Sequence, residues 1–188
     1  MLRHLRRAAL LASLAAALVA RPATAEPLSA HNQALLVVKV LGSDKDLARR
    51  ASGSAVIAVA AVQGDARAEA RRDAIVNELK LLSKDVRLQG LALDARAVTW
   101  GEADALARAS AIVVVGGLAE KAAEIVKVTR TKQVLSIGED PSAVERGLAV
   151  GVFARAAKAV ISASLLTARQ EGVTFEPSFL RTAELVDE

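Results

Sequence analysis

Few residues of this chain belong to types that carry out chemistry, and their spacing matches no known catalytic or metal-binding motif. After residue 25 the sequence contains a single histidine, His31, and the whole chain contains neither cysteine nor tyrosine. A thiolate metal site lacks its ligands, and the spacings HxH, HExxH and GxSxG do not occur. We therefore expect no catalytic site, no metal site and no cofactor. His31, close to an expected helix start, is interpreted as a surface residue.

The acidic pair Glu139 and Asp140 is the most prominent candidate for acid–base chemistry. Adjacent side chains of an extended segment point in opposite directions, so these two carboxyl groups are poorly placed to share a proton. Pro141 follows directly and favours a turn or a helix start. The pair is interpreted as a place where a ligand or partner binds. One alternative is a hydrolase that uses these carboxylates as an unusual catalytic site. Mutation of both residues without loss of activity would exclude this alternative.

Two glycines, Gly116 and Gly117, stand between an apolar run and a helical pattern in "VVVGGLAEK". Backbone N–H groups at such a turn could cradle an anion. The sequence lacks the GxGxxG fingerprint and any Walker A motif, and glycines at this position more often serve only a tight strand-to-helix turn. We keep both glycines as candidates for ligand binding.

The elements that would position these residues alternate along the chain. Ser29 is expected to cap a helix ending near Gly42, with a short continuation capped by Ser43. Apolar, β-branched runs predict strands at 55–62, 86–93, 111–118 and 133–137. Helices are expected between them: one carrying Ile75, Leu79 and Leu82, a short one at 102–109, and one carrying Leu118, Ala122 and Ile125.

The last third departs from this alternation. Runs at 148–153 and 159–163 lie close together and predict a β-hairpin, followed by helices at 165–171 and 177–186. The expected fold class is α/β: a three-layer, mostly parallel sheet with helices on both faces, and a C-terminal β-hairpin and helices. Trp100, the only tryptophan, is interpreted as a half-buried packing residue.

In an open parallel sheet, ligands bind beyond the carboxyl ends of the strands. The segments 63–65, 116–117 and 138–140 all follow predicted strands and should meet at this edge. The candidate binding residues there are Gly64, Asp65, Gly116, Gly117, Glu139 and Asp140. Arg146 joins them as a binding candidate because its charge falls between a turn and a strand with no evident structural task.

The first 25 residues have the layout of a secretory signal peptide. Three arginines open "MLRHLRRAALLASLAAALVARPATA", an apolar stretch of 13 residues follows, and small residues stand at Ala23 and Ala25. The stretch is too short for an ordinary membrane-spanning helix, although an uncleaved anchor is the alternative. We therefore predict a signal peptide at 1–25 and a single domain at 26–188, exported without a direct membrane anchor.

Removal of this segment changes the charge of the protein. The segment holds four of the 25 basic residues and no acidic residue, so 21 basic residues remain against 21 acidic ones. The mature chain is formally neutral, and aromatic residues are only 2% of the sequence. Nucleic acid is therefore not an expected partner.

The C-terminal third resembles a known family. The stretch "ERGLAVGVFARAAKAVISASLLTARQEGVTFEPSFLRTAELV" is similar to the C-terminal signature of the YfiR family of periplasmic regulators, and "LLVVKVLGSDKDLARRASGSAVIAVA" is similar to its opening helix and first strand. The matching positions are Leu165, Ala168, Arg169, Gly172, Phe175, Leu180, Ala183 and Val186. Two departures stand out. Ser164 replaces the family's asparagine, and the cysteines of its best-known member are absent, so redox control is not expected.

The resemblance implies regulation rather than catalysis. Proteins similar to YfiR bind the periplasmic part of an inner-membrane signalling protein, typically a diguanylate cyclase, and hold it inactive. Related domains occur fused to sensor kinases, and the family tends to form homodimers. A periplasmic regulator of cyclic di-GMP synthesis is therefore the first expectation, and a periplasmic protein that binds a small ligand is the alternative.

Overall fold

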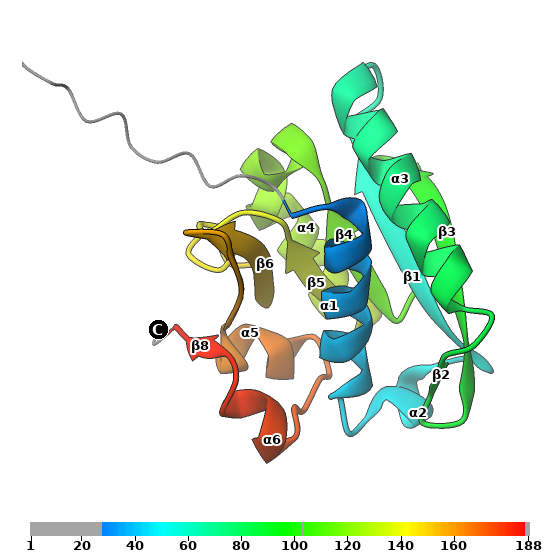
Figure 1. The fold of residues 1–188 in the computed structure, drawn as a ribbon, viewed down its shortest axis with the longest axis vertical. Coiled ribbons are helices and arrows are strands. Elements are labelled where there is room, and N and C mark those ends of the chain that lie inside the picture. Colours follow the sequence, from blue (N-terminus) through cyan, green and yellow to red (C-terminus); the bar gives the residue numbers. More distant parts are fainter. Residues whose placement is uncertain (1–27, 103, 187–188) are drawn as a thin grey trace, which may run out of the picture.

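A mixed β-sheet forms the middle of the molecule (Figure 1). The computed structural model describes residues 28–102 and 104–186, so the predicted signal peptide lies outside the described residues. Within them the sheet has eight strands in the order β2-β3-β1-β4-β5-β6-β7-β8. Neighbours from β3 to β6 are parallel, whereas β2 with β3 and β6 with β7 are antiparallel. The expected mostly parallel α/β fold is confirmed.

Most of the strands follow apolar runs of the sequence, and the two-residue strands β2 and β8 do not. Their bounds are β1 Ser54–Ala61, β2 Arg87–Leu88, β3 Leu91–Thr99, β4 Ala111–Val114, β5 Leu135–Gly138, β6 Val150–Arg155, β7 Lys158–Ala163 and β8 Glu184–Leu185. All but the first residue of β1 are buried because helices cover both faces of the sheet there. Ile57 and Val59 belong to one hydrophobic cluster, and Ala58 and Ala60 belong to a second one on the other face.

Helices supply the outer layers. α1 (Ala30–Gly42) and α3 (Ala66–Leu82) lie side by side over one face of the sheet (Figure 1). The other face is covered by the 3₁₀ helix η1 (Gly116–Lys121) and α4 (Ala122–Lys132), whose apolar side chains pack with those of β4. As predicted, Ser29 caps α1: its hydroxyl accepts a hydrogen bond from the Asn32 N–H at 3.2 Å.

Three short helices complete the fold: α2 (Leu47–Arg50), α5 (Leu165–Gln170) and α6 (Pro177–Leu180). The hairpin of β6 and β7 is present as predicted. Trp100 is half-buried, as expected, and its indole N–H donates to Glu124 at 3.0 Å. None of the helices in the described part of the chain is long and apolar enough to span a membrane.

Several expected elements differ in the structure. The predicted strand at 86–93 is instead a hairpin, because Gln89 and Gly90 both have positive φ and turn the chain between β2 and β3. The described part of 102–109 forms turns and no helix. The helix expected at 177–186 ends at Leu180; a turn follows, and Glu184–Leu185 pair with β7 as β8. The continuation after α1 begins beyond Asp46 and not at Ser43.

Candidate functional site

Four of the seven predicted site residues meet at the carboxyl-end edge of the sheet. Asp65, Gly116, Gly117 and Glu139 line a hollow of about 330 Å³, which we call the carboxyl-edge pocket. The remaining lining comes from the first turns of α3: Arg67, Ala68 and Arg71. The topology explains this meeting, because β1, β4 and β5 are adjacent and parallel and all end here.

Asp65 holds the start of α3. One of its carboxylate oxygens accepts hydrogen bonds from the N–H groups of Arg67 at 3.1 Å and Ala68 at 3.0 Å. Gly64 does not line the pocket. Its φ of +84° makes the turn into the helix, and its N–H donates to Glu69 at 3.0 Å. Gly64 therefore has a structural task, whereas Asp65 combines a capping role with a place in the pocket wall.

The carboxylate of Glu139 occupies the position at Gly116 where an anion was expected to bind. One carboxylate oxygen accepts the Gly116 N–H at 3.1 Å, and the other accepts Nε–H of Arg71 at 2.9 Å. Both charged side chains are largely buried, with exposed fractions of 15% for Glu139 and 19% for Arg71. An incoming anion would have to displace the chain's own carboxylate from the Gly116 amide. The Gly116 amide and Arg71 thus fix the position of the Glu139 side chain, which forms part of the pocket lining.

Gly116 cannot be replaced at this site without strain. Its φ is +61°, and a Cβ atom there would approach the Cβ of Ala68 to 2.8 Å. The glycine allows the start of η1 to lie against the start of α3. At Gly117, by contrast, a Cβ atom would meet no other atom within 4 Å.

Arg71 lines the pocket with a guanidinium group that is not fully hydrogen-bonded. Its Nη2 nitrogen is buried and has no hydrogen-bond partner among the described residues. Unpaired buried donors cost free energy, so an acceptor group of a ligand would be favourable here. Arg67, also in the lining, is exposed. No sequence motif points to these two arginines, although their i, i+4 spacing places them on one face of α3.

The other two candidates lie apart from this lining. A carboxylate oxygen of Asp140 accepts hydrogen bonds from the N–H of Ser142 at 2.9 Å and from its hydroxyl at 2.6 Å, which closes the turn after β5. Arg146 is exposed, and its side chain makes no hydrogen bond or ion pair within the described chain. The structure therefore gives Asp140 a local task and leaves the Arg146 guanidinium available to a partner.

The lining of the carboxyl-edge pocket combines both signs of charge. Guanidinium groups from α3 stand beside carboxylates that follow β1 and β5, which suits a small polar or zwitterionic molecule. Among the described residues, no group of three potential metal ligands lies together. His31 lies on the surface as expected, with its ring 2.9 Å from Glu78.

Sequence comparison gives the family of this α/β domain. Residues 62–184 match the model of the YfiR/HmsC-like family. The chain belongs to this family, which is one of periplasmic regulators. No curated protein matches the sequence.

Two solved structures share the fold at low sequence identity. A conserved domain protein from Vibrio cholerae O1 biovar El Tor aligns with a TM-score of 0.60 and 16% identity, over 86% of this chain and 62% of that one. An ABC domain from Streptococcus pneumoniae in complex with L-Trp aligns with a TM-score of 0.54 and 12% identity, over 78% of this chain and 60% of that one. This chain thus spans about three fifths of each, and the likeness concerns the fold.

Proposed function

We propose that this protein is a periplasmic regulator that binds the periplasmic part of an inner-membrane signalling protein and holds it inactive. The observation that carries the proposal is membership of the YfiR/HmsC-like family over residues 62–184. The partner is typically a diguanylate cyclase, so that the protein controls cyclic di-GMP synthesis from outside the cytoplasm. The alternative inner-membrane partner is a sensor kinase. The predicted signal peptide at 1–25 supports export.

The proposed mechanism is a shift of population in the membrane protein. Binding stabilises the inactive conformation by the difference in affinity between the two states, and an envelope signal that weakens binding releases the active one. The role requires a rigid binding surface and no reaction. An α/β domain whose central strands are buried on both faces meets this requirement.

Arg146 is the residue that we propose first for the partner surface. It lies between β5 and β6, is exposed and has no side-chain partner within the described chain. A contact between Arg146 and a partner would break no interaction within the described chain, and arginine is enriched among residues that dominate binding. Homodimer formation, the other expected association, is checked by light scattering of the mature protein.

Co-purification from membranes tests the proposal. The tagged full chain is expressed in its own host, crosslinked in the intact envelope and purified in mild detergent, and its partners are identified by mass spectrometry. We expect an inner-membrane cyclase or kinase with a periplasmic region. R146E should reduce its recovery about tenfold. R181E, which reverses another exposed arginine near the C-terminus, should not. Recovery of no membrane signalling protein by the unmodified chain would contradict the proposal.

The carboxyl-edge pocket favours a second candidate function, the binding of a small periplasmic ligand. The buried, unpartnered Nη2 of Arg71 suits a carboxylate, and the carboxylate of Asp65 in the same lining suits an ammonium group. A free amino acid carries both groups. The structural neighbour from Streptococcus pneumoniae, in complex with L-Trp, supports this class of ligand.

A thermal-shift screen with the common amino acids tests this candidate. A bound ligand raises the melting temperature by mass action, by several degrees at a hundredfold excess over Kd. G117L should abolish the shift, because the new side chain enters open space beside the pocket, while the unliganded melting temperature stays close to that of the wild type. If no amino acid shifts the melting temperature of the unmodified protein, the candidate fails.

A further inference from the structure

A second hollow lies at the opposite, amino-end edge of the sheet, where β1, β4 and β5 begin. Its volume is about 760 Å³, within the range of small-molecule sites. The lining comes from α2, the loop before β4, the end of α4 and the segment around the end of α5. We call it the amino-edge hollow. No predicted site residue belongs to it, and its elements lie far apart in the sequence.

Positive charge is concentrated in this hollow. Its lining includes Arg49, Arg50, Arg108, Lys132 and Arg169, whereas Asp46 is its only acidic residue. The mature chain as a whole is formally neutral, so this local concentration of positive charge is not a consequence of overall composition. Like charges held close together raise the free energy unless counter-ions neutralise them.

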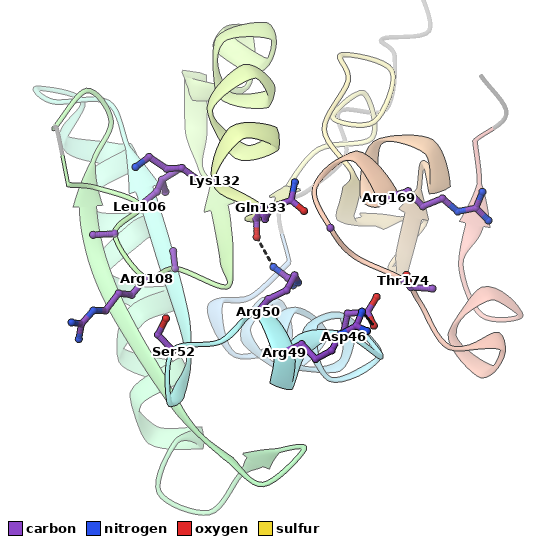
Figure 2. Close-up of a pocket in the computed structure, with 13 residues that line it drawn as sticks. Asp46, Arg49, Arg50, Ser52, Leu106, Arg108, Lys132, Gln133, Arg169 and Thr174 are labelled. Carbon is purple, nitrogen blue, oxygen red and sulfur yellow. Dashed lines mark hydrogen bonds and ion pairs between the residues drawn. The ribbon is translucent and has the colours of Figure 1, made fainter.

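Two of the five cations are already neutralised. Arg50 is only 10% exposed and pairs at 2.6 Å with Asp44, which is fully buried. Its guanidinium also donates to the backbone carbonyl of Gln133 at 2.6 Å, so it is fixed in the middle of the hollow (Figure 2). Arg49 pairs with Asp46 at 2.6 Å and is 78% exposed.

The other three cations remain without a partner. Arg108, Lys132 and Arg169 are exposed, and their side chains make no hydrogen bond or ion pair within the part of the chain that the structure describes. Figure 2 shows Arg108 and Arg169 on opposite sides of Arg50 with their side chains extending outward. Arg108 has a φ of +58°, which a side-chain-bearing residue rarely adopts, so a glycine or an asparagine would be less strained there.

We propose that the amino-edge hollow binds a multiply charged oxyanion over the fixed guanidinium of Arg50, and that the exposed side chains of Arg108, Lys132 and Arg169 turn inward to contact it from the positions seen in Figure 2. Guanidinium groups match the geometry of phosphate and carboxylate oxygens. The apolar part of the lining is limited to one leucine and two alanines, and no aromatic side chain belongs to it. The hollow therefore offers no stacking surface for a ring and favours a small, polar molecule. This inference does not depend on the proposed regulatory function.

Isothermal titration of the mature protein at low salt tests the inference, with pyrophosphate and citrate as probes and acetate as the singly charged control. At least one probe should bind at least tenfold more tightly than acetate, and affinity should fall as salt is added. Preference for pyrophosphate would assign a phosphate compound, and preference for citrate a polycarboxylate. Failure of both probes to bind, or equal binding of acetate, would overturn the proposal.

A matched pair of triple variants locates the binding. R108A/K132A/R169A should lower the affinity more than tenfold. K80A/K158A/R181A, which removes the same charge from exposed positions elsewhere, should leave it nearly unchanged. The mutated side chains of the hollow are exposed and unpartnered, so this variant should melt close to the wild type. Equal loss of affinity in the two variants would show an effect of net charge alone and overturn the proposal.

Discussion

At the scale of single residues, Glu171 is the most unusual titratable group in the described chain. Its side chain is fully buried and accepts hydrogen bonds from the Thr129 hydroxyl at 2.5 Å and from the Ser136 N–H at 2.8 Å. Burial raises the pKa of the Glu171 carboxyl to about 7, although these hydrogen bonds act in the opposite direction. The residue joins the end of α5 to α4 and the start of β5.

The raised pKa makes stability dependent on pH. Between the ordinary value of 4.5 and about 7, the folded chain keeps a proton that the unfolded chain has lost. The free energy of unfolding is therefore highest on the acidic side, falls by about 3 kcal/mol over this range and then levels off. A glutamine keeps the shape and carries no charge, so E171Q should be more stable than the wild type by about 2 kcal/mol at pH 8.

Urea unfolding at pH 5 and pH 8 checks this prediction. The wild type should lose stability between the two values, and the E171Q curve should be much flatter. E145Q, at an exposed glutamate, is the control and should keep the wild-type slope. An E171Q protein with an unchanged slope would show that Glu171 is not the group responsible.

A second residue-scale prediction concerns the buried pair of Asp44 and Arg50. Asp44 also accepts the N–H groups of Asp46 at 3.0 Å and Thr174 at 3.2 Å, so it ties α2 to the C-terminal segment. D44A should cost about 3–5 kcal/mol, because it leaves the Arg50 guanidinium buried without its counter-charge. R49A, which breaks an exposed pair in the same helix, should cost less than about 1 kcal/mol. Denaturant unfolding measures both free energies. If D44A and R49A lowered the free energy of unfolding by similar amounts, the Asp44–Arg50 pair would not have the proposed role in stability.

At the scale of elements, the β6–β7 hairpin has a turn that its sequence does not favour. Ala156 and Ala157 have φ values of +49° and +62°, and this conformation suits asparagine and glycine. Alanine there costs about 1 kcal/mol or more per residue. A156N/A157G should therefore raise the free energy of unfolding by about 1–2 kcal/mol. A157V should lower it, because a β-branched residue is strained at positive φ. Thermal or urea unfolding measures both, and stabilisation by A157V would refute the argument.

Elements with long apolar patterns were predictable from the sequence, and short ones decided by tertiary pairing were not. The buried run at 55–62 was predicted as a covered strand from its β-branched residues, and its helical neighbours followed from their spacing. The segment at 184–185 carries no strand pattern of its own, and it becomes β8 because β7 offers an open edge. Likewise, the turn at Gln89–Gly90 depends on two positive φ values within one apolar run.

Of the two hollows, one was predictable from the sequence and the other depends on the tertiary fold. The carboxyl-edge pocket was predictable because Asp65, Gly116 and Glu139 each follow a strand of one parallel sheet. Arg71 was missed because a charge on a helix usually indicates a solvated face. The amino-edge hollow has no sequence signal, since its cations come from separate helices and loops that only the fold brings together.

At the scale of the whole molecule, the sheet separates two polar hollows of different character. The carboxyl-edge pocket has balanced charges, whereas the amino-edge hollow has an excess of positive charge. The rigid, doubly covered strands between them hold both in place. The two proposed ligand sites therefore lie at opposite edges of the sheet.

The central claim, periplasmic repression of a diguanylate cyclase, is tested most directly by the cellular level of cyclic di-GMP. A strain without this protein should contain several times more cyclic di-GMP than its parent. The full chain should restore the parental level, and residues 26–188 without the signal peptide should not, because the chain would stay in the cytoplasm. An unchanged level in the deletion strain, or equal restoration by both forms, would contradict the claim.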